Sequence, residues 1–331
     1  MRLALIGATG LVGSKLLEVL EEFDFPFEEL LPVASSRSLG KTIRCKGKDY
    51  PVVGIQTALK KAPHLAIFTA GGTVSKEFAP QFAAKGCWVI DNSSAFRMDQ
   101  EIPLIVPEIN AGLLANHHRI VANPNCSTIQ LVLALSGLHR NWQIKRIVTS
   151  TYQAVSGSGH TAIQQLLGER NGTDHPNCYP HPIDLNVIPH GGEFDAEGNT
   201  SEELKLIHET RKILNAPEIQ VSATVVRVPV QNGHSLSANI EFHRPFEIEA
   251  IRQTLAETPG VTVFDQPDRN EYPTPLLANE QNQVLVGRIR RDASCQNCLN
   301  LWISADNLRK GAATNALQIA QHLLNHHLLT I

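Results

Sequence analysis

One cysteine, in the segment NPNCSTIQ at residues 123–130, is placed where it could act as a nucleophile. Pro124 disfavours a helical conformation at Asn123, so we expect a helix to begin after it, with Ser127 or Thr128 opening the apolar run that follows. Cys126 would then lie at the helix N-terminus, where unpaired N–H groups and the helix dipole stabilise a thiolate. The alternative is that Cys126 is a small buried hydrophobic residue.

A glycine-rich turn near the start of the chain suits a dinucleotide. GATGLVG follows a short apolar run and precedes an amphipathic helix. Glycines in such a turn let the backbone approach a pyrophosphate, which the helix N-terminus then binds. The GxxGxxG spacing is a variant of the usual fingerprint, and its place between a strand and a helix raises its specificity. The predicted cofactor-binding residues here are Gly7, Thr9, Gly10, Leu11, Val12 and Gly13.

The segment VASSRSLG bears on which dinucleotide is bound. An NAD-binding chain usually carries an acid at the end of its second strand, for the ribose 2′-hydroxyl. No acid lies between Val33 and Gly40. Ser35, Arg37 and Ser38 instead offer hydroxyls and a guanidinium, which suit a 2′-phosphate. We therefore predict NADP, the alternative being a solvated loop that binds nothing.

A thiol together with a dinucleotide indicates aldehyde chemistry. A thiolate adds to an aldehyde, the adduct gives a hydride to the nicotinamide, and a thioester remains. This scheme needs an acid/base, oxyanion donors, and charged groups for the rest of the substrate. Backbone N–H groups around Cys126, together with Asn125, are the predicted oxyanion donors.

Four further residues could serve this chemistry. Arg97 follows the predicted strand 87–91, at the edge where parallel sheets bind ligands, and Gln153 lies near the end of another strand. Arg227 interrupts an apolar strand, where an arginine needs a partner or a ligand. His234, the fourth candidate, follows a turn with Gly233. The alternatives are a structural ion pair for Arg227 and a merely hydrogen-bonded side chain for His234.

Other polar residues give weaker signals. Glu202 and Lys205 are three residues apart on a predicted helix and could be no more than a surface pair. The histidines of the segment 171–200 lack metal-ligand spacing, and the CxxC of Cys295 and Cys298 has no second pair. We expect no metal site.

The pattern of predicted strands and helices changes along the chain. Up to about residue 125, short apolar runs alternate with helical patterns, which predicts βαβ units and a parallel sheet. Later strands are longer and alternate, as in a sheet with one face covered by helices. The predicted strands are 2–7, 30–35, 65–70, 87–91, 119–123, 145–155, 220–231, 234–244 and 299–306. The predicted helices begin after the glycine-rich turn and at 74–86 (with Gly86 as C-cap), 201–214, 247–257 and 308–327.

Length and composition limit the classes of function. The 331 residues suggest about two domains. A net charge of -3 gives no indication of nucleic-acid binding. No apolar run approaches the ~20 residues that a membrane span needs. Six cysteines without a signal peptide indicate reduced thiols in a cytoplasm. We expect a cytoplasmic protein with a small-molecule substrate and neither nucleic-acid nor membrane partners.

These motifs together resemble the aspartate-β-semialdehyde dehydrogenase family over essentially the full chain. The matching segments keep the family order: GATGLVG, ASSRSLG, IDNSSAFRM, NPNCSTIQ, STYQAVSGSG, NVIPH, EELK, SATVVRVPV with GHS, VGRIRRD and DNLRKGAATNALQIA. The resemblance implies a Rossmann-like α/β NADP-binding domain, residues 1–125 with the C-terminal helix 308–331. It implies an α+β catalytic and dimerisation domain with a mixed sheet, residues 126–307.

The resemblance also implies a role for each candidate residue. Cys126 would become the acyl-thioester with Asn125 beside it, and His234 would be the acid/base. Gln153 would orient the substrate. Further implied roles are phosphate binding by Arg97 and Lys205, binding of the substrate amino and carboxylate groups by Glu202 and Arg227, and nicotinamide contacts by Ser156, Gly157 and Asn307.

The implied reaction is the NADP-dependent conversion of L-aspartyl-4-phosphate to L-aspartate-4-semialdehyde, in lysine, threonine and methionine biosynthesis. The implied assembly is a homodimer, with a tetramer as the alternative. The chain departs from the family pattern at QNGHSLSAN and at GGEF after IPH, although the catalytic positions remain. Two other functions stay open: an N-acetylglutamyl-phosphate reductase-like enzyme, and a non-catalytic NADP-binding paralogue. SSAFR and the spacing of Arg227 and His234 disfavour the first, and retention of Cys126 disfavours the second.

Overall fold

The computed structural model describes residues 1–329, which fold as two compact units. The first unit is Met1–Pro124 with the segment that begins at Ala312, and the second is Asn125–Gly311. The sequence placed these boundaries after residues 125 and 307. Residues 308–311 belong to the second unit because they form a turn around Asp306, whose Oδ1 accepts the N–H of Leu308 and Arg309 at 2.8 and 3.0 Å.

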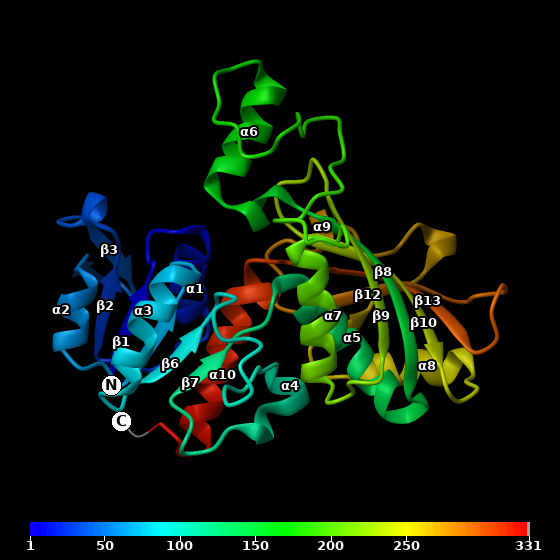
Figure 1. Ribbon diagram of the computed structural model, residues 1–331, viewed down its shortest axis with the longest axis horizontal. Helices are drawn as coiled ribbons and strands as arrows, with labels where there is room; N and C mark the ends of the chain where they lie inside the picture. The colour runs from blue at the N-terminus through cyan, green and yellow to red at the C-terminus, as the bar shows by residue number, and fades with distance from the viewer. Residues whose placement is uncertain (330–331) are drawn as a thin grey trace. The chain divides into compact units, whose positions relative to one another are not determined.

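The first unit contains a five-stranded parallel sheet in the order β2-β1-β5-β6-β7. Its strands are β1 (Arg2–Ile6), β2 (Glu29–Val33), β5 (Leu65–Phe68), β6 (Trp88–Asp91) and β7 (Ile120–Ala122), and a separate hairpin is formed by β3 (Thr42–Cys45) and β4 (Lys48–Pro51). Its helices are α1 (Leu11–Glu22), α2 (Ile55–Lys60), α3 (Gly72–Ala83), α4 (Pro107–Asn110) and α10 (Thr314–Asn325). This is the predicted Rossmann-like arrangement (Figure 1).

Alternate side chains of each buried strand pack on opposite faces of this sheet. Leu3 and Leu5 join a core with residues of α1 and α10, whereas Ala4 and Ile6 join one with residues of α2 and α3. Continuous apolar runs such as RLALI therefore form strands that are covered on both faces.

Some predicted elements of this unit need correction. The helix predicted at 74–86 is α3, which ends at Ala83 with Ala84 as its C-cap, so Gly86 is not the cap. Gly86 instead has a φ of 80° in the turn that leads to β6. The hairpin β3–β4 and the helix α2 were not predicted, since their short, mixed sequences lack a clear period.

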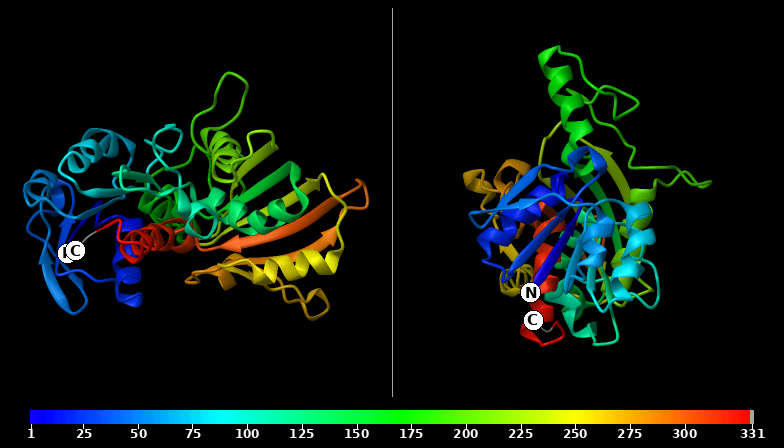
Figure 2. Two further views of the ribbon diagram at one scale, coloured as in Figure 1. Left: turned by 90° about the horizontal axis from the view of Figure 1, so that it is seen from below. Right: turned by 90° about the vertical axis from the view of Figure 1, so that its left-hand side faces the viewer.

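The second unit contains a six-stranded mixed sheet in the order β11-β12-β13-β10-β8-β9. Its strands are β8 (Ile144–Gln153), β9 (Gln220–Arg227), β10 (His234–Phe242), β11 (Val261–Val263), β12 (Val284–Arg291) and β13 (Cys298–Ala305). Its helices are α5 (Cys126–Trp142), α6 (His160–Asn171), α7 (Ser201–Ile213), α8 (Ile248–Glu257) and α9 (Pro275–Ala278). The pairs β8–β9 and β11–β12 are parallel and the other pairs antiparallel, as Figure 2 lets the reader follow in the long strands coloured green to orange.

Helices cover one face of this sheet. α5 packs against β8, β10, β12 and β13, while α7 packs against β9 and α8 against β11 and β12. The other face carries half-buried side chains, among them Val148, Tyr152 and Trp302. The predicted alternation is thus confirmed, with fully buried side chains toward the helices.

Three predictions about this half of the sequence differ from the structure. The helix predicted at 308–327 is interrupted: Arg309–Ala313 form a wider π-helical turn before α10. The strand β12 was not predicted. The expectation of reduced thiols is wrong for Cys295 and Cys298, which the hairpin between β12 and β13 brings to a Cα–Cα distance of 5.5 Å in a disulfide. None of the helices within residues 1–329 is long and apolar enough to cross a membrane.

Candidate active site

Cys126 is the first residue of α5, so its predicted place at a helix N-terminus is confirmed, although the helix opens there rather than at Ser127 or Thr128. Asn125 is the N-cap, and its Oδ1 accepts the N–H of Ser127 at 3.0 Å and of Thr128 at 3.3 Å. Asn125 is favourable at this position because a short polar side chain satisfies N–H groups that have no partner within the helix. The cysteine is half-buried.

The cap changes one expectation about oxyanion donors. The N–H groups of Ser127 and Thr128 already donate to Asn125, and Nδ2 of Asn125 donates to Oε2 of Glu202 at 2.7 Å. These three groups are therefore engaged within the protein. The donor roles of the Cys126 N–H and of the second hydrogen on Nδ2 of Asn125 stay predictions.

His234, the first residue of β10, carries a further hydrogen-bond donor. Its Nδ1 accepts the N–H of Ala154 at 3.0 Å, so the proton of the neutral ring lies on Nε2. The side chain is fully buried, and Nε2 has no hydrogen-bond partner among residues 1–329. Burial, and secondly the charge of Arg227, hold the pKa of His234 well below its ordinary value, so the ring is neutral.

Arg227, at the end of β9, lies beside His234. A Cβ atom added to Gly157 would lie 3.0 Å from Nη1 of Arg227 and 3.1 Å from Nε2 of His234, so both side chains reach the same backbone position. Arg227 is only 7% exposed, yet no residue in the described part of the chain pairs with its guanidinium. A buried guanidinium is costly without a partner, and no structural ion pair of Arg227 is seen within residues 1–329. Binding of an anionic ligand group by Arg227 stays a prediction.

The helix α7 brings two predicted substrate-binding residues next to the nucleophile. Glu202 forms an ion pair with Lys205 through Oε1 and binds Asn125 through Oε2. Burial raises the pKa of Glu202, but Lys205, Arg227 and the Asn125 amide outweigh it, and the net pKa is lowered. The pair is therefore more than a solvated surface contact, because Glu202 also connects α7 to the cap of α5.

Gln153 and the predicted nicotinamide contacts lie in the same unit. Nε2 of Gln153, at the end of β8, donates to Oγ of Ser127 at 2.9 Å, while its buried Oε1 has no partner within residues 1–329. Nδ2 of Asn307 donates to Oγ of Ser156 at 2.9 Å, and Oδ1 of Asn307 accepts the N–H of Gly233 at 3.0 Å. Gln153 thus has an oxygen available to a ligand beside the first turn of α5.

The predicted cofactor turn lies in the first unit. The N–H groups of Gly7 and Ala8 donate to the carbonyl of Val33 at 2.9 and 3.0 Å, which ties the turn to the end of β2. Gly7 has a φ of 90°, and a Cβ at Gly13 would lie 2.2 Å from the carbonyl oxygen of Gly7, so neither position tolerates a side chain. Gly10 caps α1 without a side-chain hydrogen bond, which suits an N-terminus that binds a phosphate group.

The other predicted ligand residues of this unit differ in exposure. Ser35 and Arg37 are exposed in the loop after β2, where Ser36–Ser38 form a short 3₁₀ turn. Arg97 is 7% exposed, and its Nε and Nη2 donate to the carbonyls of Asn123 and Asn92 at 2.9 and 2.8 Å. Backbone carbonyls therefore hold this guanidinium in the loop after β6.

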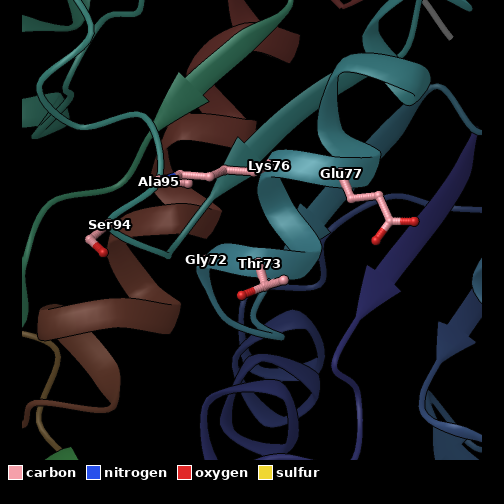
Figure 3. Close-up of a pocket in the computed structure, with 6 residues that line it drawn as sticks. All are labelled: Gly72, Thr73, Lys76, Glu77, Ser94 and Ala95. Carbon is pink, nitrogen blue, oxygen red and sulfur yellow. The ribbon is translucent and has the colours of Figure 1, made fainter.

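A pocket of about 590 Å³ opens at the carboxyl end of the parallel sheet (Figure 3). Its side chains come from the start of α3 and from the loop after β6, which follow neighbouring strands. Open α/β sheets bind ligands at this edge. The lining residues are Gly72, Thr73, Lys76, Glu77, Ser94 and Ala95.

Comparison with known proteins decides the family. The family model described as semialdehyde dehydrogenase, NAD binding domain, matches residues 2–117, and the one described as semialdehyde dehydrogenase, dimerisation domain, matches residues 135–310. The aspartate-semialdehyde dehydrogenase of Aquifex aeolicus is 48% identical, over 99% of each chain. The chain belongs to the aspartate-semialdehyde dehydrogenase family. The enzyme of Bacillus subtilis, another member, is 42% identical over 98% of this chain and 97% of its own.

Solved structures of aspartate-semialdehyde dehydrogenases share the fold. That of aspartate semialdehyde dehydrogenase II from Vibrio cholerae, complexed with ASA, has a TM-score of 0.94 with 43% identity over 98% of both chains. That of the Candida albicans enzyme, determined with NADP, has a TM-score of 0.79 with 25% identity over 99% of both chains. The predicted family and fold class are confirmed.

Sequence reasoning missed two features of this candidate site. One is the N–H of Ala154, whose bond to His234 depends on the fold. The other is Glu209 on α7, which is 1% exposed and whose Oε2 accepts the N–H of Asn125 at 2.7 Å. A signal for Glu209 existed, since it follows Glu202 by seven residues and two helical turns place both acids on one face.

The departures from the family pattern adjoin the site. In GGEF, the carbonyl of Gly191 accepts the N–H of Glu202 at 3.0 Å, and a Cβ at Gly191 would lie 2.6 Å from Val225. In QNGHS, Gly233 donates to Asn307. Gly191 of the GGEF departure therefore supports Glu202 through its backbone, whereas Gly233 belongs to the matching GHS segment.

Proposed function

We propose that the chain reduces L-aspartyl-4-phosphate to L-aspartate-4-semialdehyde with NADPH, through an acyl-thioester on Cys126. The observation that carries this proposal is a buried guanidinium without a protein partner, Arg227, in the unit that places a cysteine at the start of α5. Membership of the family, and relatives named for the semialdehyde, support the choice of substrate.

In the first step, the Cys126 thiolate attacks the acyl-phosphate carbon. The carbonyl oxygen becomes an oxyanion, and Nε2–H of His234 donates a hydrogen bond to it. When the oxyanion collapses, the bond from carbon to the phosphate oxygen breaks, phosphate leaves with its electron pair, and the thioester remains. A neutral histidine suffices, because it donates a hydrogen bond without losing its proton.

The second step releases the aldehyde. NADPH, when bound, supplies the hydride to the thioester carbon. His234 again stabilises the oxyanion, whose collapse breaks the carbon–sulfur bond and regenerates the Cys126 thiolate. In this scheme His234 is a hydrogen-bond donor in both steps, rather than the acid/base that the resemblance implied.

Charged side chains would recognise the two ends of the substrate. Arg227 would bind the α-carboxylate in bidentate fashion, and Glu202, whose lowered pKa keeps it ionised, would bind the amino group. Lys205 and Arg97 would bind phosphate. Substrate binding would break the ion pair between Glu202 and Lys205, because each of the two side chains would bind a substrate group of opposite charge. The free Oε1 of Gln153 would accept a hydrogen bond from the substrate.

The residues of the first unit fit a dinucleotide. The turn from Gly7 to Gly13 and the uncapped start of α1 suit a pyrophosphate. The exposed guanidinium of Arg37 and the hydroxyls of Ser35 and Ser38 would bind the 2′-phosphate that distinguishes NADP from NAD. Ser156, Gly157 and Asn307 would contact the nicotinamide end, as the resemblance implies.

A second copy of the chain would cover the open face of the mixed sheet. A pocket of about 370 Å³ on the sheet is lined by Trp302, Tyr272 and Arg288, among others, and aromatic and arginine side chains are enriched at interfaces. The family model for this part is named for dimerisation. Sedimentation should show a dimer that Trp302→Glu weakens, and a wild-type monomer at micromolar concentration would contradict this assembly. The cytoplasmic location stays a prediction.

The decisive assay follows NADPH formation from L-aspartate semialdehyde, NADP and phosphate. The proposal expects formation that requires phosphate. N-acetylglutamate semialdehyde should be a poor substrate, because its acylated nitrogen carries no charge for Glu202. A preference for that compound would favour the reductase-like alternative, and absence of turnover with either would favour the non-catalytic paralogue.

A further inference from the structure

Asn125, which caps the nucleophile helix, is held between two carboxylates of α7. Its side-chain amide donates to Glu202, and its backbone N–H donates to Oε2 of Glu209, each at 2.7 Å. The two acids are seven residues apart, and two turns of helix bring them to one face. The two carboxylates therefore fix both the side chain and the backbone of Asn125.

Glu209 differs from Glu202 in its surroundings. Glu209 is 1% exposed, whereas the side chain of Glu202 is 14% exposed and pairs with Lys205. Burying a carboxylate costs free energy unless it is hydrogen-bonded, and a bond from an N–H group to a carboxylate is shorter and stronger than one between neutral groups. The bond from the Asn125 N–H to Glu209 is thus both short and shielded from water.

This bond fixes the backbone one residue before Cys126. Asn125 Oδ1 accepts the N–H of Ser127 and Thr128, so the orientation of Asn125 determines how α5 begins. Cys126 follows Asn125 directly, so a displacement of the Asn125 backbone also displaces the Cα of Cys126. Displacements of about 1 Å at a reacting group can cost on the order of a hundredfold in rate.

We infer that Glu209 is a positioning residue, which fixes the Asn125 peptide through its N–H and thereby fixes Cys126 for attack. The inference rests on the proposed role of Cys126 as nucleophile. Glu209 does not touch the substrate, so its effect should fall on kcat while KM changes little. A Gln side chain at position 209 places an amide oxygen at the same distance from the helix and should preserve the hydrogen bond from the Asn125 N–H.

Three substitutions at Glu209 test this. Glu209→Leu removes the acceptor, and kcat should fall by about 30- to 100-fold with KM changed less than about threefold. Glu209→Gln should restore kcat to within about fivefold of wild type. Glu209→Asp keeps the charge but shortens the reach, so it should resemble Leu; it also serves if the Leu variant does not fold.

Glu203 provides the matched control on the same helix. Its carboxylate also accepts backbone N–H groups, in this case two, from Val225 at 2.9 Å and Thr200 at 2.6 Å, and neither is that of Asn125. Glu203→Leu should lower the melting temperature and leave kcat per folded molecule near wild type. If Glu209→Leu behaves in the same way, Glu209 is a structural residue and the inference is overturned.

Hydrogen exchange gives a readout that does not depend on activity. In Glu209→Leu, a peptide that includes residues 125–128 should exchange at least about tenfold faster than in wild type, whereas Glu209→Gln should match wild type and a peptide from α8 should be unchanged. Unchanged exchange at 125–128 would overturn the claim that Glu209 fixes the Asn125 backbone. If wild type is inactive but the exchange pattern is as expected, Glu209 fixes the Asn125 backbone and the proposed function is rejected.

Discussion

The backbone N–H of Ala154 donates a hydrogen bond to Nδ1 of His234 over 3.0 Å. This contact decides which ring nitrogen carries the proton, since Nδ1 must keep its lone pair to accept. Nε2 therefore carries a proton and lacks a partner among residues 1–329, in a fully buried ring beside Arg227. The arrangement favours donation to an oxyanion over removal of a proton from the thiol.

The first prediction concerns pH. The pKa of His234 is lowered by burial and by Arg227, so the folded protein keeps the ring neutral where an unfolded histidine takes up a proton. Below about pH 6.5 the unfolded state binds more protons at this residue, and the free energy of unfolding should fall as the pH drops. His234→Gln should lose this part of the dependence, measured by urea unfolding at several pH values.

The same neutral ring predicts the kinetic profile. Between about pH 5.5 and 8, kcat/KM of wild type should show no titration that His234→Gln removes. An acid limb near pH 6.5 that is present in wild type and absent from the Gln variant would show that His234 titrates during catalysis.

The second prediction concerns Arg227. Removing the charge with Leu should lower kcat/KM on the order of a hundredfold or more, because a charged hydrogen bond to the substrate carboxylate is lost. Lysine should also be harmful, since it cannot copy a bidentate contact. Leu suits the strand, so the melting temperature should change little; kinetics and thermal unfolding on one preparation measure both effects.

An exposed arginine on the neighbouring strand is the control for this substitution. Arg146→Leu, on β8, should leave kcat/KM within about twofold. A large loss of melting temperature in Arg227→Leu, with unchanged kcat/KM per folded molecule, would reject the carboxylate-binding role.

The third prediction concerns coenzyme choice. Arg37→Leu should raise KM for NADP at least about tenfold and leave KM for NAD nearly unchanged, because only NADP carries the 2′-phosphate. Arg44→Leu, at an exposed site on β3, is the control and should change neither. Equal kcat/KM of wild type with the two coenzymes would contradict the assignment of this loop.

Much of the fold could be predicted from local sequence. Apolar runs such as RLALI form strands because both faces of a parallel sheet are buried, and NPNCST gives a cap and a helix start because proline and asparagine act locally. β12 escaped prediction because its arginines lie on an otherwise apolar pattern, and only pairing with β13 makes it a strand.

The candidate site was less accessible to sequence reasoning. Residue types and spacing suggested Cys126, Arg227 and His234, since each is unusual in its surroundings. Which N–H groups are free, which ring nitrogen is protonated, and that Glu209 is buried against Asn125 all depend on contacts between distant segments. Those contacts add Nε2–H of His234 to the oxyanion donors expected at the start of α5.

The most direct test of the account is mass spectrometry of the acyl-enzyme. Wild-type protein mixed with L-aspartate semialdehyde and NADP, without phosphate, should gain one aspartyl group, mapped by peptide analysis to Cys126. Cys178→Ala, which removes the exposed free thiol of the same unit, should give the same adduct, whereas Cys126→Ala should give none and show no turnover. An adduct on another residue, or near-wild-type turnover by Cys126→Ala, would contradict the central claim that Cys126 is the nucleophile.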